Sequence, residues 1–405
     1  MADRVPRGRI GRLARVGYAA AQQAARQAGT RAVNMTRSEE QAQAALERRQ
    51  LETAEQIVNV LGGMKGAAMK LGQVLSFVDI GIVPADDRER FQAKLASLRD
   101  AAPTVSFEQM RKVIEQDLGE GAADRLARSI TPELDTKAVG DEIRERIVEE
   151  LDYELEASNQ RTMARIYAGH PFISIPAVIT PLCRERVIVS EFVTGAGFDE
   201  MRAAPEAERD RTGEILFRFY FGSMYRYRRF SGDPHPGNML GLADGRIAFL
   251  DFGLFKSIDR DVAALELACQ RAVIDGDEEE LQRLMSDAGF LPRSDVIGAD
   301  ELVEFVRDGI WWYTTDESIR IDQTIVNRAF IQTTDVRSSH FKTARHQDIV
   351  PEHLLGRRLE LLTLAVLGQL ESEANWYRIA CEWIYGDEPA TELGREEAAW
   401  MEANG

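Results

Sequence analysis

The sequence of 405 residues contains only three cysteines, Cys183, Cys269 and Cys381, which lie far apart. An odd number at such spacing excludes a disulfide framework and favours a reducing compartment. Long apolar runs are also missing. The longest stretch without a charged residue, 166–183, contains three prolines, so it cannot form a membrane-spanning helix. No secretory signal pattern opens the chain. These absences predict a soluble, cytoplasmic protein.

Acidic residues outnumber basic residues in the chain as a whole, 67 to 50, but basic residues dominate at its N-terminal end. The net charge of -17 argues against general affinity for nucleic acid. Residues 1–37 nevertheless hold eight arginines and one acidic residue, a balance of +7, which leaves -24 for the rest (-17 - 7). This basic N-terminal arm has two interpretations. We favour a solvated arm, and the alternative is a basic amphipathic helix in peripheral contact with the inner face of a membrane.

A hydrophobic content of 44% is enough for a full core, and the length suits about two to three domains. Helical patterns cover 39–78, 86–100, 106–118, 141–168, 205–228 and everything from 258 onward, with a buried helix expected at 354–370. β-branched runs predict a hairpin from 172–179 and 186–193. A second hairpin is expected from 239–242 and 246–250, because Asp244-Gly245 between them is a strong turn signal.

The strongest chemical signal is the loop Asp233-Pro-His-Pro-Gly-Asn238, followed by the second hairpin and then by Asp251-Phe252-Gly253. Protein kinases place a catalytic-loop Asp and Asn five residues apart, with the Mg²⁺-binding aspartate after a short hairpin. One carboxylate faces the acceptor group, while an amide and a second carboxylate converge on the metal that bridges the ATP phosphates. Each segment alone is more often a structural turn. Their order and spacing together predict a nucleotide and metal site.

These segments resemble the UbiB-type, or AarF-type, atypical kinase-like family. The family loop HADPHPGN corresponds to 231–238, and its KxGQ motif is present as Lys70-Leu71-Gly72-Gln73. Its ExD motif is present as Glu150-Leu151-Asp152, with Tyr153, Glu156 and Asn159 following, and 187–193 is similar to its hinge. The resemblance covers roughly 55–118 and 135–385.

The resemblance implies a role for each matching residue of the metal and nucleotide site. Asp233 would be the catalytic-loop carboxylate, and Asn238 and Asp251 would be the Mg²⁺ ligands. The backbone of the hinge, from Glu191 to Val193, would meet the adenine of ATP or ADP. His235 is expected mainly to shape the loop, in a position to touch phosphate or metal.

Further implied roles fall on the N-terminal half of the chain. Glu150 would be the glutamate of the small-lobe helix, with Asp152 as its companion. Lys70 and Gln73 would lie on an extension that folds over the site, and Lys70 would donate to Glu150 or Asp152. Without the family context, Lys70 would be read as a surface lysine on a packing helix. The family is linked to ATP hydrolysis and to isoprenoid-quinone lipid metabolism at membranes.

Two departures from the family pattern stand out. Ser231 replaces the histidine that normally braces the loop. The larger departure is that the alanine-rich loop and the strand lysine that pairs with the phosphates are missing. Between Gln73 and Glu150 the only lysines are Lys94, Lys112 and Lys137, none of them in a strand pattern. Loss of that cation would cost orders of magnitude in phosphoryl-transfer rate unless Lys70 or an arginine replaces it.

We therefore expect an α+β protein-kinase-like fold with a helical N-terminal extension, a reduced small lobe and a mainly helical large lobe. The expected divisions are the basic arm 1–37, the extension 38–118, the small lobe 119–193 and the large lobe 194–405. The leading function is an ATP- and Mg²⁺-dependent kinase-like ATPase that supports quinone or other prenyl-lipid metabolism. A nucleotide-binding pseudokinase scaffold is the second hypothesis, and a metal-dependent phosphohydrolase using Asp233, His235 and Asp251 is the third.

Overall fold

The computed structural model describes residues 152–184, 187–334, 340, 343–344, 346–348 and 350–404. By its internal contacts the chain divides into two compact units, Met1–Ser129 and Ile130–Gly405, and every described residue belongs to the second. Within the described ranges, no helix is both long enough and apolar enough to cross a membrane.

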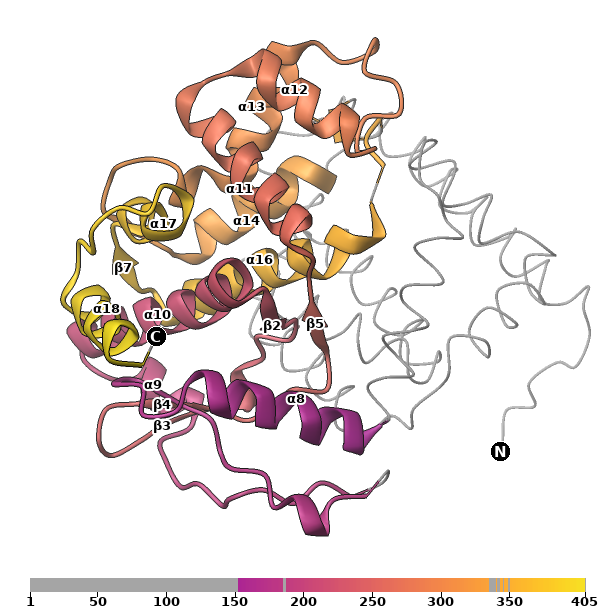
Figure 1. The fold of residues 1–405 in the computed structure, drawn as a ribbon. Helices are drawn as coiled ribbons and strands as arrows, with labels where there is room; N and C mark the ends of the chain where they lie inside the picture. The colour runs from indigo at the N-terminus through magenta and orange to yellow at the C-terminus, as the bar shows by residue number, and fades with distance from the viewer. Residues whose placement is uncertain are drawn as a thin grey trace, which may run out of the picture. The chain divides into compact units, whose positions relative to one another are not determined.

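Helices dominate the described part of the chain (Figure 1). The α-helices are α8 (Tyr153–Ile166), α9 (Phe198–Arg202), α10 (Glu206–Phe217), α11 (Arg260–Asp275), α12 (Glu278–Asp287), α13 (Ala299–Ile310), α14 (Gln323–Thr334), α16 (Pro351–Leu370), α17 (Trp376–Ile384) and α18 (Glu392–Asn404). Short 3₁₀ or π segments are η2 (Thr180–Leu182), η3 (Arg218–Tyr227), η4 (Pro236–Asn238) and η5 (Trp311–Tyr313). The strands are β1 (Ile173–Ser174), β2 (Arg229–Ser231), β3 (Met239–Gly241), β4 (Ile247–Phe249), β5 (Phe255–Ser257), β6 (Ile319–Arg320) and β7 (Glu373–Ala374).

The predicted hairpin at 239–250 is confirmed. Strands β3 and β4 pair antiparallel with Met239 opposite Phe249, and Gly245 in the turn has a φ of 84°, which favours glycine. The Asp244 carboxylate accepts from the Arg246 backbone N–H, which fixes the turn. Strand β1 adds to the other edge of β4 in parallel, so the sheet order is β1-β4-β3.

The predicted hairpin at 172–193 forms only in part. Its first residues, Ile173 and Ser174, pair with β4 and not with the second run. The two runs meet through single antiparallel bridges, Val178 with Ser190 and Arg184 with Val187, around the short turn η2. Pro176 interrupts the first run, and Pro181 lies in the connecting turn η2. Proline has no backbone N–H to donate to a strand ladder.

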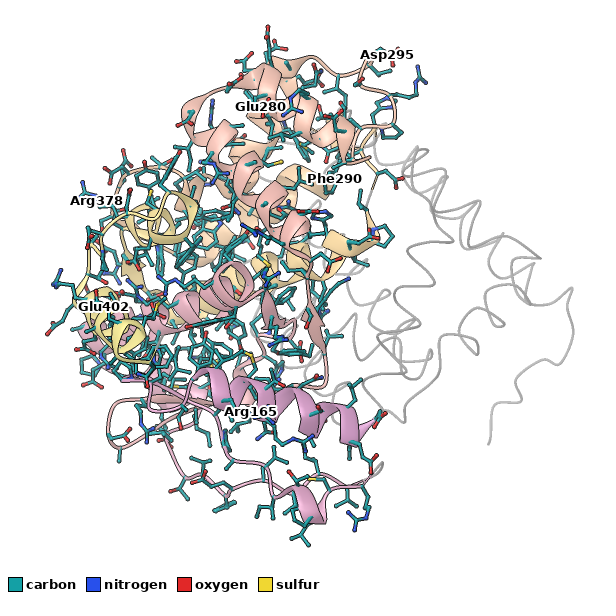
Figure 2. The ribbon with its side chains drawn as sticks, viewed as in Figure 1. Arg165, Glu280, Phe290, Asp295, Arg378 and Glu402 are labelled. Carbon is teal, nitrogen blue, oxygen red and sulfur yellow. The ribbon has the colours of Figure 1, made fainter. Side chains whose placement is uncertain are left out.

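Aromatic residues build the core around α10 and η3. Phe217, Phe219 and Phe221 are almost completely buried, and Trp312 and Trp376 pack against the ring of Phe217. Figure 2 shows side chains filling the space between the helices of this region. The segment η3 is followed by its C-cap, Arg228, which adopts a left-handed conformation. The chain turns there into β2.

The expectation of helix from 258 onward holds for most of the described residues there, which also include connecting loops and one short strand pairing. Strands β6 and β7 are antiparallel, and Ile321 donates to the Ser372 carbonyl beside them. This bridge joins the chain before α14 to the chain after α16, a long-range pairing that local patterns do not reveal. The predicted buried helix is confirmed as α16, in which 11 of the 20 residues are buried.

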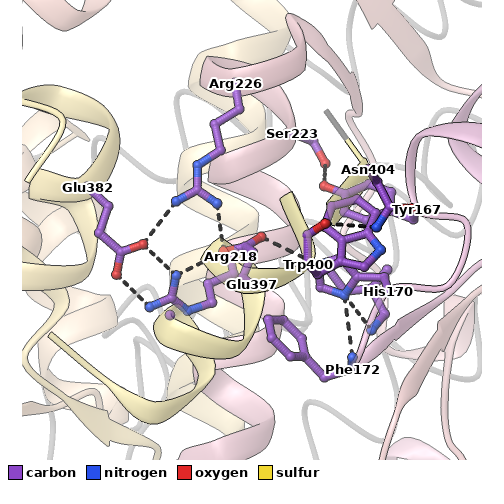
Figure 3. Close-up of polar contacts among 12 residues, drawn as sticks. Tyr167, His170, Phe172, Arg218, Ser223, Arg226, Glu382, Glu397, Trp400 and Asn404 are labelled. Carbon is purple, nitrogen blue, oxygen red and sulfur yellow. Dashed lines mark hydrogen bonds and ion pairs between the residues drawn. The ribbon is translucent and has the colours of Figure 1, made fainter. Parts of the chain in front are cut away.

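A buried ion cluster joins the C-terminal helices to the core (Figure 3). The guanidinium of Arg218 has no solvent exposure and lies 2.7 Å from Glu382 Oε1 and 3.0 Å from Glu397 Oε2. Arg226 Nη1 lies 2.6 Å from the same Glu397 oxygen. His170, just after α8, places Nε2 3.6 Å from Glu397 Oε1. The cluster therefore connects the end of α8, segment η3 and the helices α17 and α18.

Replacing Arg218 with methionine should strongly destabilise the fold. The variant keeps most of the side-chain volume but leaves two carboxylates, Glu382 and Glu397, short of a buried cationic partner. Breaking a buried pair from one side typically costs about 3–5 kcal/mol, and we expect that decrease in the free energy of unfolding. Arg378→Met is the control, because this arginine pairs with Asp316 at the surface (Figure 2) and should change stability little. Urea denaturation measures both, and an equal effect of the two substitutions would contradict the prediction.

The cluster also predicts an acid-sensitive stability. Burial opposes ionisation of Glu397, but contacts with His170, Arg226 and Arg218 outweigh it and lower its pKa from 4.5 to about 2. A carboxyl whose pKa is lower in the folded state stabilises the fold above its unfolded pKa. That contribution is lost as pH falls from about 4.5 toward 2.

Glu397→Gln should therefore flatten the loss of unfolding free energy in that pH window, by up to about 1.4 kcal/mol per pH unit. Glu402→Gln, on the exposed face of the same helix, should leave the slope unchanged. Urea titrations at a series of pH values measure the slope. An acid limb identical in the wild type and Glu397→Gln would disprove the assignment.

Candidate functional site

Two nested strand pairings bring the motif segments together. Strand β2 pairs with β5, and β3 pairs with β4, so the loop 232–238 and the loop 250–254 both begin and end on paired strands. Their contact is reinforced by backbone bonds, since Gly232 N–H donates to the Leu254 carbonyl at 2.7 Å and Leu250 N–H donates to the Asn238 carbonyl at 2.9 Å. The two loops are therefore held side by side by backbone geometry.

Three of the predicted site residues meet at this junction. The Asn238 amide donates to Asp251 Oδ2 at 3.3 Å and to the Asp233 carbonyl at 3.4 Å. Asp251 Oδ1 accepts from the Gly253 backbone N–H at 2.9 Å, which fixes the carboxylate orientation. All three side chains are only partly buried. The structure thus places an amide and a carboxylate at one point, with Asp233 adjoining them.

These donors suit magnesium. Mg²⁺ prefers hard oxygen ligands and is usually held by one or two carboxylates together with substrate phosphates and water. Asp251 and the side-chain oxygen of Asn238 supply ligands of this kind. Among the residues that the structure describes, no three His, Cys, Asp or Glu side chains group closely enough to hold a metal ion.

Arg358 is a site residue that sequence reasoning did not single out. It projects from α16, places Nη2 2.8 Å from Asp233 Oδ1 and donates from Nε to the Gly232 carbonyl at 3.2 Å. The guanidinium thus fixes one oxygen of the Asp233 carboxylate. A signal was present, because two consecutive arginines inside a run predicted to be buried require acidic partners.

Helix α8 supports the second loop. The Asn159 amide donates to the Phe252 carbonyl at 3.2 Å. A Cβ at Gly253 would lie 3.6 Å from Glu156 Oε2, so this helix approaches the Asp251-Phe252-Gly253 segment closely. Both α8 residues belong to the segment that resembles the family's ExD region, although neither was predicted as a site residue.

His235 and Ser231 shape the first loop. The Nδ1 atom of His235 accepts from the Gly237 N–H at 3.0 Å, which agrees with the expected loop-shaping role. Ser231 Oγ accepts from the Asp233 N–H at 3.5 Å, so the serine retains a weak brace at the position of the family's histidine. Tyr220 lies beneath the loops. Burial, followed by the charges of Asp233 and Asp251, raises its pKa well above 10, so its phenol stays neutral.

The predicted hinge is connected to the same sheet. Glu191 N–H donates to the Ala177 carbonyl at 2.7 Å, and Ala196 exchanges two backbone bonds with Gly241 in β3. Gly195 makes this approach feasible, because a Cβ there would lie 2.5 Å from the Gly241 oxygen. The predicted contact of Glu191 and Val193 with adenine stays a prediction.

Of the remaining predicted residues, the structure describes only Asp152. Asp152 is the N-cap of α8, and its carboxylate accepts from the Glu154 and Leu155 N–H groups. Its expected nucleotide role stays a prediction. Lys70, Gln73 and Glu150 lie outside the described residues, as does the interval where the small-lobe lysine is expected to be missing.

Loop, hairpin and supporting helix together define a kinase-like protein, and comparisons with known proteins agree. Residues 122–285 match the family model of the ABC1 atypical kinase-like domain. This part of the chain is therefore an ABC1 atypical kinase-like domain, in agreement with the UbiB/AarF resemblance of the sequence motifs.

Two curated relatives illustrate the match. The chain is 31% identical to Protein ACTIVITY OF BC1 COMPLEX KINASE 1, chloroplastic, from Arabidopsis thaliana, over 38% of this chain and 23% of that protein. It is 23% identical to Atypical kinase COQ8B, mitochondrial, from Rattus norvegicus, over 59% of this chain and 54% of that protein. The chain therefore spans about a quarter to half of the length of these relatives.

A solved structure has a similar fold. It is described as the complex structure of Rv3197-erythromycin from Mycobacterium tuberculosis, with a TM-score of 0.53 and 23% identity. The likeness covers 86% of this chain and 98% of that one. With the family match, it supports a kinase-like, helix-rich α+β fold.

Removing the Asn159 amide should loosen the second motif loop. Asn159→Ala deletes the bond to Phe252, and a partly buried hydrogen bond typically contributes about 0.5–1.5 kcal/mol, so the free energy of unfolding should fall by that amount. Amide exchange at Gly253 should also become faster. Asn404→Ala deletes a similar bond to Trp400 at the exposed C-terminus and should affect neither quantity. Unchanged exchange at Gly253 in Asn159→Ala would contradict this role for helix α8.

Proposed function

We propose that this protein binds Mg-ATP between the two motif loops and acts as an atypical kinase-like ATPase that supports isoprenoid-quinone or other prenyl-lipid metabolism. The observation that carries the nucleotide part is the meeting of Asn238 with Asp251 at 3.3 Å, next to Asp233. In the family pattern these are the metal ligands and the catalytic-loop carboxylate. The lipid part rests on the family resemblance.

In this proposal the chain's own groups have separate tasks. Asp251, oriented by the Gly253 N–H, and Asn238, held between Asp251 and the Asp233 carbonyl, present oxygen ligands to the metal. Asp251 and Asn238 would hold Mg²⁺, which would supply neutralisation of the phosphate charge when bound. Asp233 accepts the proton of the attacking water or hydroxyl. Arg358 holds the Asp233 carboxylate in one orientation, which keeps it aimed into the loop junction.

A second function is favoured by the same arginine. The ion pair with Arg358 occupies one oxygen of Asp233 at 2.8 Å, which makes that oxygen less accessible to a substrate. The sequence between Gln73 and Glu150 also has no lysine in a strand pattern. Both observations suit a pseudokinase that binds nucleotide as a scaffold and turns it over weakly.

ATP turnover by the purified full chain tests the leading proposal. We expect Mg²⁺-dependent release of phosphate from ATP, abolished in Asp251→Ala because the variant loses the ionised metal ligand. Asp277→Asn is the matched control, since this residue caps α12 at the surface and asparagine caps a helix equally well. It should retain wild-type turnover.

Thermal denaturation with and without Mg-ATP separates the alternatives. Saturating nucleotide at about 100 times its dissociation constant should stabilise a binding-competent chain by about 2.7 kcal/mol. Stabilisation without turnover would favour the scaffold, and cleavage of simple phosphate esters would favour the phosphohydrolase. A chain that neither binds nor hydrolyses ATP defeats both kinase-like hypotheses. The membrane contact of residues 1–37 stays a prediction.

A further inference from the structure

A cavity lies among the C-terminal helices, separate from the two motif loops. Its volume is about 260 Å³, close to the lower end of the roughly 300–1,000 Å³ usual for small-molecule sites. Helices α11, α13, α14 and α16 contribute to its wall together with the segments beside them. Phe290, labelled in Figure 2, closes part of it from the segment between α12 and α13. The apolar lining includes Leu265, Met285, Phe290, Phe305, Val306 and Ile310.

The cavity and the motif loops use different sides of helix α16. Arg358 contacts Asp233 in the first loop, whereas Arg357 lines the cavity. Consecutive residues of an α-helix point about 100° apart, so one helix contributes to both places without joining them. A ligand in the cavity therefore does not compete for the motif residues.

Four charged or titratable residues of the cavity wall pair with one another, Glu266, His353, Arg357 and Glu360, and Asp348 is the remaining acidic residue of the lining. Arg357 pairs with Glu266 and, at 2.9 Å, with Glu360, while His353 Nδ1 also contacts Glu266. Tyr313 donates to the other oxygen of Glu360 at 3.3 Å. Because these carboxylates already have partners, the wall has no strong demand for a charged ligand. Burial and the nearby Glu266 raise the pKa of the Cys269 thiol to about 12, so this lining group is neutral too.

One polar group of the lining lacks a partner. Gln347 belongs to the wall, and its Nε2 atom is buried without any hydrogen-bond acceptor. Buried donors are nearly always satisfied, so such an atom needs an explanation. Rotation of the terminal amide would direct an N–H toward the cavity, where an acceptor oxygen of a ligand would satisfy it.

We propose that this cavity binds a small, uncharged molecule with a mainly hydrocarbon body and one acceptor oxygen, such as an aromatic ketone. The apolar lining takes the body, the paired charges disfavour an ionised ligand, and Gln347 donates to the oxygen. This site is independent of ATP binding.

Gly309 offers a direct way to fill the cavity. This residue of α13 lines it, and a Cβ placed there would meet no atom within 4 Å. Gly309→Leu should occupy the space needed by the ligand without a clash at its Cβ. Gly309→Ala is the matched control, because it makes the same backbone change in helix propensity but adds only a methyl group.

The test uses 2-acetylnaphthalene as the neutral probe and 2-naphthoate as an anion of similar shape. Titration of the full chain, followed by probe fluorescence, should give micromolar binding of the ketone and at least tenfold weaker binding of the naphthoate. Gly309→Ala should bind the ketone like the wild type, and Gly309→Leu should lose at least tenfold in affinity. Gln347→Leu should reduce ketone affinity to that of 2-ethylnaphthalene, which has no acceptor.

A second filled variant keeps the outcome decisive. Ala329→Leu fills the cavity from α14, in case Gly309→Leu does not fold. Three outcomes would overturn the proposal. The ketone affinity of both filled variants could equal that of the wild type, or naphthoate could bind the wild type as tightly as the ketone does. The ketone could also fail to bind the wild type up to its solubility limit.

Discussion

The site depends on one constraint, the nested pairing of four short strands around two loops. Because β2 pairs with β5 outside the β3–β4 hairpin, residues that are 13 apart in sequence, Asn238 and Asp251, meet at 3.3 Å. The pairing uses backbone groups, so it leaves the loop side chains available for chemistry. Strand ladders also tolerate little register error, since a slip of one residue would turn the loop-flanking side chains to the opposite face. The other supports, Asn159 from α8 and Arg358 from α16, act on loops that this pairing has already placed.

The helices around that sheet serve stability and chemistry at once. Helix α16 is largely buried, yet it carries two arginines. Arg358 contacts the Asp233 carboxylate, and Arg357 contacts the buried Glu266. The C-terminal helix α18 also carries a buried charged residue. Its Glu397 contacts Arg218, Arg226 and His170. Buried ion pairs of this kind contribute little net stability compared with apolar packing, but they penalise every arrangement that separates the partners. They therefore specify how the terminal helices lie on the core.

Much of the fold and site could be predicted from local signals. Asp244-Gly245 indicated the β3–β4 hairpin, and the apolar pattern of 354–370 indicated the buried helix α16. Family motifs correctly indicated the ABC1 domain. The expected hairpin at 172–193 was only partly right, because prolines broke the ladder and β1 paired with β4 instead. The β6–β7 pair was missed, since two-residue strands far apart in sequence leave no periodic pattern.

The sequence by itself determined the spacing of Asp233, Asn238 and Asp251, which marked them as candidate site residues. It also determined that a buried helix would contain charges. Only the tertiary structure decided the partners of those charges. Arg358 reaches Asp233 across 125 residues of sequence, and Arg218 reaches Glu397 across 179. Local propensity cannot encode such pairs, because a side chain's partner depends on how distant helices pack and not on its own neighbours in the chain.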